Sequence, residues 1–427
     1  MKSAGWPAMF VAELEETGEA ELKTGPFGTQ LHASDYTEYG TPVLNVRNIG
    51  FGRVQPDKLE TISAETRDRL SGHLLIADDI VFGRKGAVER HLFVSTAEAG
   101  WLQGSDCLRL RFKKDRVIPR FVSYFLLTEY HKQWMANHCS HGATMASLNQ
   151  DIIRRISLPF PSADVQKKIA AILSAYDDLI ENNERRIKIL EEMAQNLYRE
   201  WFVKFRFPGH KKVKMVGSPL GKIPQGWKVK SLAELAGINA RSIKKGKEPD
   251  ELLYIDIASV NPGSVNLKQR YDFSAAPGRA RRIVQHGDLI WSCVRPNRKS
   301  YALILNPEPN LIVSTGFAVI SATQTPFTYL YFALTTDDFV GYLTNHATGA
   351  AYPAVTAKDF ESATILKPAS AVLSRFHETV SPILELRHSV NNRNASLRQT
   401  RDLLLPKLIS SEVDVSELDI RIPENAA

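Results

Sequence analysis

Residues 161–207 read PSADVQKKIAAILSAYDDLIENNERRIKILEEMAQNLYREWFVKFRF. Apolar side chains recur along this segment in steps that alternate between four and three residues, which is the heptad spacing of a coiled coil. The spacing predicts one helix of about 40 residues, roughly 60 Å long at 1.5 Å per residue. Its eight Lys/Arg and eight Asp/Glu cancel, so the helix has no excess charge with which to hold phosphates. We expect a structural helix.

A second segment with similar spacing begins after residue 369, although Arg387 and Arg401 interrupt its apolar seam and Pro406 should end or kink the helix. A lone helix of this kind would expose its apolar stripe, so we expect the two helices to pair antiparallel within the chain. Pairing between two chains is the alternative, and Asn183 either fixes the register or faces solvent. The residues expected to pair the helices or dock subunits are Ile169, Leu173, Tyr176, Ile180, Asn183, Ile187, Leu190, Leu197, Val380, Ile383, Val390, Asn394, Leu397 and Leu404.

The chain repeats itself with a period near 210 residues, far longer than the unit of a solenoid. The expected fold is α+β: two duplicated globular α/β domains, separated by two long antiparallel coiled-coil helices and related by a pseudo-two-fold axis. The domains should cover residues 1–160 and 208–368, with helices in 161–207 and 369–427. The matching segments are Trp6 with Trp227, VLNVRNI from Val43 with YIDIASV from Tyr254, Asp79-Ile80-Val81 with Asp288-Leu289-Ile290, and Pro161 with Pro368.

Local signals refine this outline. One helix is expected from about Pro119 to Asn137. Ser147-x-x-Gln150 and Thr356-x-x-Asp359 have the spacing of a capping box and should each open a short helix. The Pro, Gly and Lys content of residues 207–227 predicts an unpacked linker, and the acidic residues 412–427 are expected to be loosely ordered.

Composition limits the class of protein. The 427 residues are 43% hydrophobic and 24% charged, without an apolar run of membrane-spanning length or a signal-peptide core, so a cytoplasmic protein without membrane contact is expected. The three cysteines show no CxxC spacing and are expected to be reduced and mostly buried. The group His131, His138, Cys139 and His141 lacks paired ligands, so no metal site is expected.

No catalytic constellation is present: the chain has no phosphate loop, GxGxxG, HExxH or GxSxG, and no convincing methyltransferase or nuclease motif. The chain has a net charge of +7, and its positive excess lies in residues 207–368, which hold 20 Lys/Arg and 12 Asp/Glu; this favours contact with nucleic acid. Arg can bind guanine bidentately, Asn can bind adenine, and Lys suits phosphate. Solvated hairpin tips, turns or core positions are the alternatives. The candidate DNA-binding residues are Arg47, Asn48, Arg84, Lys85, His141, Thr144, Arg295, Asn297, Arg298, Lys299 and Tyr352.

Six segments occur in a fixed order: GPFGTQL (25–31), GTPVLNVRNI (40–49), SLNQDIIRRISLPFPSADVQKKIAAIL (147–173), REWFVKF (199–205), GKIPQGW (221–227) and RDLLLPKLISSEV (401–413). In this order they resemble the specificity (S) subunits of Type I restriction-modification enzymes, over essentially the whole length of the chain. One departure is Ser411, where members of that family commonly have glycine.

The resemblance implies that the two modules are target recognition domains, each reading one half of a bipartite double-stranded DNA site. The helices would set the spacer and dock two methyltransferase (M) subunits, and two restriction (R) subunits would complete the enzyme. S-adenosylmethionine, ATP and Mg would then belong to the partners, and this chain would hold no cofactor and catalyse nothing. The alternatives are a coiled-coil interaction scaffold without DNA specificity and a self-contained DNA methyltransferase or nuclease.

Overall fold

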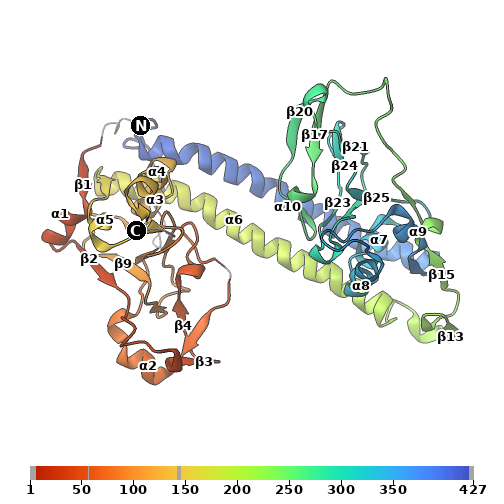
Figure 1. Ribbon diagram of the computed structural model, residues 1–427, viewed down its shortest axis with the longest axis horizontal. Helices are drawn as coiled ribbons and strands as arrows, with labels where there is room; N and C mark the ends of the chain where they lie inside the picture. The colour runs from red at the N-terminus through yellow and green to blue at the C-terminus, as the bar shows by residue number, and fades with distance from the viewer. Residues whose placement is uncertain (1–5, 56, 142–145, 423–427) are drawn as a thin grey trace. The chain divides into compact units, whose positions relative to one another are not determined.

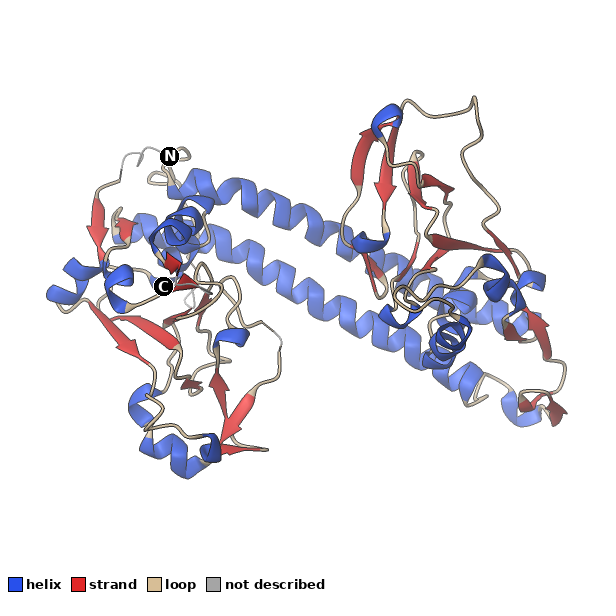
Figure 2. Cartoon of the chain, in the orientation of Figure 1, coloured by secondary structure: helices blue, strands red, loops and turns tan. Residues whose placement is uncertain are grey.

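The computed structural model describes residues 6–55, 57–141 and 146–422. It divides into two compact units: unit 1 holds residues 1–182 and 394–427, and unit 2 holds residues 183–393. The two longest helices, α6 (Ala163–Tyr198) and α10 (Ser370–Ile409), each contribute residues to both units. Both units mix helices with sheets (Figures 1 and 2). The expected α+β class, with a long helix between globular domains, is confirmed.

Unit 1 contains two four-stranded sheets. The first is antiparallel with order β2-β9-β6-β7, and the second has order β3-β5-β4-β8 with β4 and β8 parallel. The pairs β1–β12 and β10–β11 complete the strands. Their bounds are β1 (Ala8–Phe10), β2 (Ala20–Thr24), β3 (Tyr36–Thr37), β4 (Thr41–Leu44), β5 (Glu60–Ile62), β6 (Ile80–Gly83), β7 (His91–Phe93), β8 (Leu102–Gln103), β9 (Cys107–Phe112), β10 (Ser140–His141), β11 (Ala146–Ser147) and β12 (Ser157–Pro159).

Helices cover the first sheet of unit 1 and share its core. Phe82 of the sheet, Phe121, Ile153, Ile169 and Leu408 belong to one buried apolar cluster, so the start of α6 and the end of α10 are part of the core. The shorter helices are α1 (Val11–Glu16), α2 (Ala64–Arg69), α3 (Pro119–Leu126), α4 (Glu129–His138) and α5 (Gln150–Arg154), with single turns η1 (Ala33–Asp35), η2 (Val46–Asn48) and η3 (Ser71–His73).

Unit 2 repeats this plan. Its antiparallel sheet has order β16-β25-β22-β23, its mixed sheet has order β20-β17-β24-β21, and three two-stranded pairs, β13–β14, β15–β26 and β18–β19, lie outside them. The bounds are β13 (Met215–Ser218), β14 (Gly221–Pro224), β15 (Lys228–Ser231), β16 (Ala236–Ile238), β17 (Glu251–Ile255), β18 (Val260–Asn261), β19 (Ser264–Val265), β20 (Gln269–Asp272), β21 (Ala280–Ile283), β22 (Leu289–Ser292), β23 (Tyr301–Leu303), β24 (Leu311–Ser314), β25 (Phe317–Ala322) and β26 (Thr364–Lys367).

An aromatic cluster holds the helices of unit 2 together. Phe202 packs edge-on against Tyr329 and Phe376, each at 4.8 Å between ring centroids, and Trp227 joins the same cluster. The rings therefore link the turn that follows α6, the helix Phe327–Ala333 and the start of α10. The helical bounds are η4, a π-helical turn (Arg199–Val203), η5 (His210–Lys212), η6 (Leu232–Glu234), η7 (Ile257–Ser259), η8 (Phe273–Ala275), η9 (Pro296–Arg298), α7 (Phe327–Ala333), α8 (Asp337–His346) and α9 (Ala357–Ser362).

The two units have matching strand registers. Val43 is the parallel partner of Leu102 in unit 1, and Tyr254 is the parallel partner of Ile312 in unit 2. The antiparallel sheets also correspond strand for strand. The mixed sheets differ only at their edges, where β3 extends one and β21 extends the other. This agreement explains the 210-residue period of the sequence as a repeated domain.

A buried carboxylate precedes the central strand of each unit. Asp79 accepts two hydrogen bonds from Arg111, at 2.6 and 2.7 Å, and Asp288 pairs with Arg241 at 2.6 Å. In unit 2, Ser321 stands at the position of Arg111, and Arg241 also donates to its hydroxyl. Both units thus have an ion pair at this carboxylate, but the arginine comes from β9 in unit 1 and from the segment after β16 in unit 2.

Two expectations about the short helices are wrong. The single helix expected near residues 119–137 is two helices. The first, α3, ends at Leu126, and the Thr128 side chain then caps the second, α4, by accepting a hydrogen bond from His131 N. Asn149 rather than Ser147 caps α5. In unit 2 the Thr356–Asp359 capping box that opens α9 is confirmed. Asn149 and Thr356 are the N-cap residues of corresponding helices. The capping-box spacing therefore marked the correct N-cap at Thr356 but not at Ser147.

The expected linker and tail are better packed than their composition suggests. Phe207 and Trp227 are buried at 4% and 5% exposure, and a hairpin lies between them. In the tail, Val415 is 1% exposed, and Lys168 donates to Ser416 O. Helix α10 passes Pro406 and ends at Ile409, after which Ser411 adopts a positive φ of 60°. That backbone favours glycine, which explains the family preference at this position.

Arg241→Met is expected to lower the free energy of unfolding by about 3–5 kcal/mol, because it strands the Asp288 carboxylate in the interior. Arg270→Met is the matched control, since its partner Glu251 is half exposed and an exposed pair contributes about 0–1 kcal/mol. Urea unfolding of both variants measures the difference, and equal losses would contradict a special role for the buried pair.

Two buried histidines give unit 1 an acid-sensitive core. His91 contacts Ser123 Oγ at 2.8 Å, and His131 lies between Phe125 and Trp134. Burial lowers the pKa of each imidazole from 6.5 to about 3. The folded chain keeps both neutral while the unfolded chain protonates them below about pH 6.5. Their stabilising contribution is therefore complete above pH 6.5 and is lost progressively as the pH falls toward 3.

We expect the free energy of unfolding to fall by about 2 kcal/mol per histidine between pH 6.5 and pH 5. His131→Phe removes one titrating group and should flatten this dependence. Met135→Leu changes a buried neighbour without removing a titrating group, so it should keep the full slope. Denaturant unfolding at several pH values compares the three proteins, and an unchanged slope in His131→Phe would rule out His131 as a source.

Candidate nucleic-acid interface

The loop after β22 carries three cations in an unusual backbone. Arg295 and Lys299, at the two ends of η9, both have positive φ, 50° and 56°. Such a conformation costs a non-glycine residue roughly 1–3 kcal/mol and persists only where its surroundings hold it. The Arg295 guanidinium lies 4.5 Å from the centre of the Tyr352 ring and donates to Ala351 O, and Lys299 Nζ pairs with Asp337 at 2.7 Å. Both end residues are therefore held by side-chain contacts.

The middle of the same turn is presented to solvent. Asn297 and Arg298 are exposed, and within the described chain neither side chain has a hydrogen bond or ion pair. An amide and a guanidinium side by side can donate to base edges, with adenine and guanine as their respective partners. Of the four predicted polar residues in this loop, the structure leaves these two available.

The loop after β6 has the same backbone arrangement with different side chains. Arg84 N donates to Asp106 O, as Cys293 N donates to Gly316 O, and Gly86 N donates to Ala146 O, as Arg295 N donates to Pro353 O. Gly86 thus stands at the position of Arg295 and also has a positive φ, 83°. Arg84 is half-buried and Lys85 exposed, with Lys85 Nζ 3.6 Å from Asp106. The cations of the first loop, Arg84 and Lys85, therefore lie two residues and one residue before the position that Gly86 and Arg295 share.

The remaining predicted residues lie in different settings. Arg47 is exposed and pairs with Glu60 at 3.0 Å, whereas Asn48 is fully buried and its Oδ1 accepts from Asn45 N. The counterpart of Asn48 is Ser259, which closes a similar turn with Asp256. Asn48 therefore shapes the turn that presents Arg47. His141 lies in β10, Thr144 lies outside the described residues, and Tyr352 is 68% exposed beneath Arg295.

One cluster in unit 1 was missed by the sequence reasoning. Phe51 is 45% exposed, and two cations approach its ring: Arg90 at 5.5 Å and Lys132 at 5.1 Å. Arg53 is exposed two residues away. An aromatic side chain among cations is a common nucleic-acid contact. The only local signal was the run Phe51-Gly52-Arg53, since Arg90 and Lys132 come from other elements.

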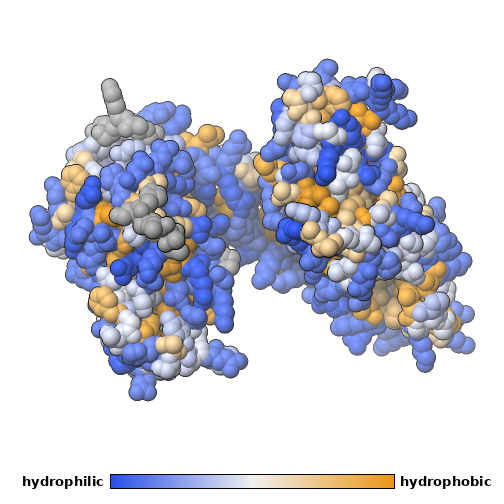
Figure 3. Space-filling view, in the orientation of Figure 1, coloured by the Kyte–Doolittle hydropathy of each residue, from blue (hydrophilic) through white to orange (hydrophobic). Residues whose placement is uncertain are grey.

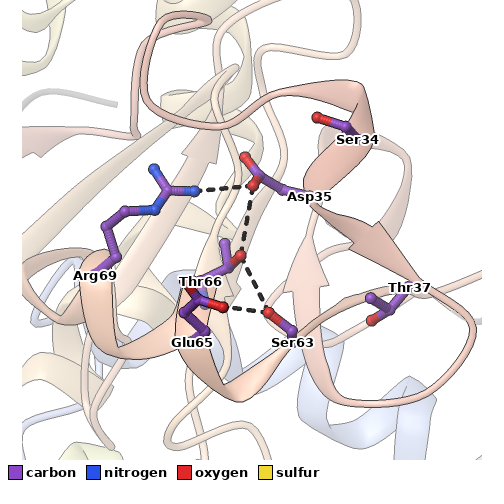
Figure 4. Close-up of a pocket in the computed structure, with 7 residues that line it drawn as sticks. All are labelled: Ser34, Asp35, Thr37, Ser63, Glu65, Thr66 and Arg69. Atoms are coloured by element: carbon purple, nitrogen blue, oxygen red, sulfur yellow. Dashed lines mark hydrogen bonds and ion pairs between the residues drawn. The ribbon is translucent and has the colours of Figure 1, made fainter.

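A polar depression of about 250 Å³ lies where η1 and β3 meet α2 (Figure 4). Its side chains bond to one another: Arg69 pairs with Asp35 at 2.9 Å, and Thr66 N donates to Ser63 Oγ. The neighbouring Arg69 Nη1 also donates to Gln30 O. These hydrogen bonds and this ion pair use the polar groups of the depression to attach α2 to the preceding η1 segment. The visible face of each unit is otherwise mostly hydrophilic with small apolar patches (Figure 3).

The long helices lie antiparallel within unit 1. Arg401 pairs with Asp177 at 2.6 Å, and the Asn394 amide donates to Ile180 O at 3.2 Å. Residue numbers rise along α6 as they fall along α10. Asp177 also accepts the Tyr124 hydroxyl at 2.6 Å, so this carboxylate joins both helices to α3.

Unit 2 shows the same direction of pairing, since Glu191 pairs with Arg387 and Trp201 packs against Phe376. Each arginine that interrupts the seam of α10 therefore meets a carboxylate on α6. Among the predicted pairing residues, one group is buried: Ile169, Leu173, Ile180, Asn183, Val380, Val390 and Asn394. A second group is half-buried: Tyr176, Ile187, Leu190, Leu197, Ile383, Leu397 and Leu404.

The thiols are free, as expected. Burial raises the pKa of Cys107 to about 12 and that of Cys139 and Cys293 to about 11, so all three stay protonated at neutral pH. Within residues 6–55, 57–141 and 146–422, no three His, Cys, Asp or Glu side chains are grouped to hold a metal. Among the same residues, none of the helices combines the length and apolar character needed to span a bilayer.

Comparisons with known proteins agree with this architecture. Residues 29–192 match the family model of the Type I restriction modification DNA specificity domain. The chain is 26% identical, over 71% of its length and 71% of the relative, to the Type I restriction enzyme MjaIX specificity subunit of Methanocaldococcus jannaschii. It is 22% identical to the HindI specificity subunit of Haemophilus influenzae, covering 76% of this chain and 84% of that one.

A solved structure shares the fold. The crystal structure of the Type I restriction-modification S subunit from M. genitalium superposes with a TM-score of 0.63 at 16% identity, covering 96% of this chain and 97% of that chain. At this identity the likeness concerns the fold alone. Through the matched domain, the curated relatives and the shared fold, the chain is similar to Type I restriction-modification specificity subunits.

Proposed function

We propose that this chain is the DNA sequence-recognition subunit of a cytoplasmic Type I restriction-modification complex. Each globular module contacts one half of a bipartite double-stranded DNA site. The observation that carries the proposal is the repeated loop, held at one register by matching backbone bonds in both units. The same loop backbone with different side chains would allow the two domains to recognise two different half-sites.

The available side chains differ in the two modules. Asn297 and Arg298 have exposed side chains without a bond to any other described residue of unit 2. In unit 1, Arg84 and Lys85 begin the corresponding loop, whose last residue, Arg90, contacts Phe51. Arg295 is held against Tyr352, so we assign it to shaping the loop. Lys299 has the same role through Asp337.

Catalysis is assigned to partner subunits. We infer that two methyltransferase subunits bring S-adenosylmethionine and that two restriction subunits bring ATP and Mg²⁺. This chain supplies recognition and scaffolding, and holds none of these groups itself. A purified chain that methylated DNA without partners would contradict the assignment.

Arg298→Ala should relax base preference in one half-site, and Arg84→Ala in the other, because each removes a guanidinium able to bind guanine. The loss is expected to be about 1–3 kcal/mol of discrimination per contact. Sequencing of methylated adenines in cells that carry each variant reports both half-sites at once.

Arg270→Ala is the matched control, since this exposed arginine on the edge strand β20 of unit 2 pairs with Glu251 on β17 and lies outside the loop. It should leave the methylated motif unchanged. A relaxed motif in the control, or an unchanged motif in both loop variants, would remove these loops from the reading surface.

We also propose that the paired helices set the spacer between the half-sites. Inserting one heptad in α6 after Asn182 and a matching heptad in α10 after Arg393 adds about 10 Å of helix, equal to about three base pairs. The methylated motif should gain spacer length and keep both half-sites. The insertion in α6 alone is the control, because it shifts the apolar seam of α6 without a matching shift of the seam of α10. A stable double insertion with the original spacer would exclude the helices as the ruler.

A further inference from the structure

The segment after the π-helical turn is strongly basic. Between Glu200 and Glu234 the chain has no carboxylate and eight cations: Lys204, Arg206, Lys211, Lys212, Lys214, Lys222, Lys228 and Lys230. Glu200 pairs with Lys204 and Arg206, and Glu234 pairs with Lys230. The other five lysines are exposed and have no ion pair within the described chain. Their charge is therefore uncompensated.

Two of these lysines, Lys211 and Lys212, border a depression that includes apolar side chains. This depression of about 480 Å³ has Trp201, Phe207 and Pro208 among its lining residues, and Arg206, Lys211 and Lys212 also line it. The two rings are 8% and 4% exposed, so they form its floor. A ligand entering here would meet aromatic surface below and cations at the rim.

The adjoining hairpin continues the apolar surface. Met215, Val216 and Leu220 are 46%, 37% and 54% exposed, and Val203, two residues after Trp201, is 57% exposed. Strands β13 and β14 pair only with each other among the described strands. Residues 201–223 therefore combine four exposed apolar side chains with four exposed lysines that have no ion pair within the described chain, which makes a mixed surface within unit 2.

We propose that this surface, residues 201–223, docks an acidic segment of the methyltransferase subunit, one that presents apolar side chains together with carboxylates. This assignment rests on the proposed function and adds a docking site outside the long helices. DNA fits less well, because a duplex offers phosphates to the lysines but little apolar surface to cover Met215, Val216 and Leu220. A protein segment can satisfy both, with apolar contacts at the centre and charges at the rim.

The test uses the full chain and the methyltransferase subunit of the same system. Lys211→Glu/Lys212→Glu/Lys214→Glu reverses three rim charges, and Met215→Ser/Leu220→Ser removes apolar surface without changing charge. Lys244→Glu/Lys245→Glu/Lys247→Glu is the matched control, since it makes the same charge change on another exposed segment of unit 2. Thermal unfolding checks that each variant folds.

Two affinities are measured for every protein, one for the methyltransferase subunit by calorimetry and one for duplex DNA carrying the methylated motif. Both surface variants should lose about tenfold or more in affinity for the subunit and keep their affinity for DNA, while the control binds the subunit normally. Loss of DNA binding with normal subunit binding would overturn the proposal in favour of a phosphate contact. Normal binding of both partners would overturn it outright. If the unaltered chain failed to bind either partner, the proposed function itself would fall.

Discussion

The apolar stripes of α6 and α10 must be covered, and the way they are covered determines the rest of the structure. In unit 1, Ile169 and Leu173 of α6 and Leu408 of α10 belong to the same buried cluster as the helices that flank the sheet. In unit 2, Ala194 and Phe376 are likewise part of the domain core. Each half of the helix pair is therefore fused to one globular module by shared side-chain packing. A module cannot turn on its helices without opening its own core.

Polar contacts add direction to this packing. Asp177 binds both Arg401 of α10 and the Tyr124 hydroxyl of α3. In unit 2, Arg387 donates to Gly263 O in the β18–β19 turn and contacts Tyr331 of α7. Apolar contacts tolerate sliding by one helical turn, whereas these bonds form in only one register. The arginines that appear to weaken the seam in the sequence thus fix where each module sits on its helices.

The sequence predicted the features that depend on periodicity. Heptad spacing gave both long helices, and the 210-residue repeat gave the duplicated module. Features that depend on contacts between distant residues were missed. Thr128 separates two helices because its hydroxyl caps α4. The hairpin near Met215 lies in a Lys- and Gly-rich segment whose composition does not predict strands. The Phe51 cluster needed three separate elements to come together, and no local pattern contains all three.

The two equivalent loops show why residue type alone is a poor guide to base contact. Gly86 and Arg295 occupy the same left-handed position, but glycine adopts it at no steric cost while arginine requires support. Tyr352 and Ala351 provide that support by engaging the guanidinium. A side chain that stabilises its own backbone in this way is a poor candidate for reading a base, because contact with DNA would have to compete with the loop. The exposed neighbours Asn297 and Arg298 carry no such constraint, so the strain at Arg295 shifts the expected contact two or three residues along the chain.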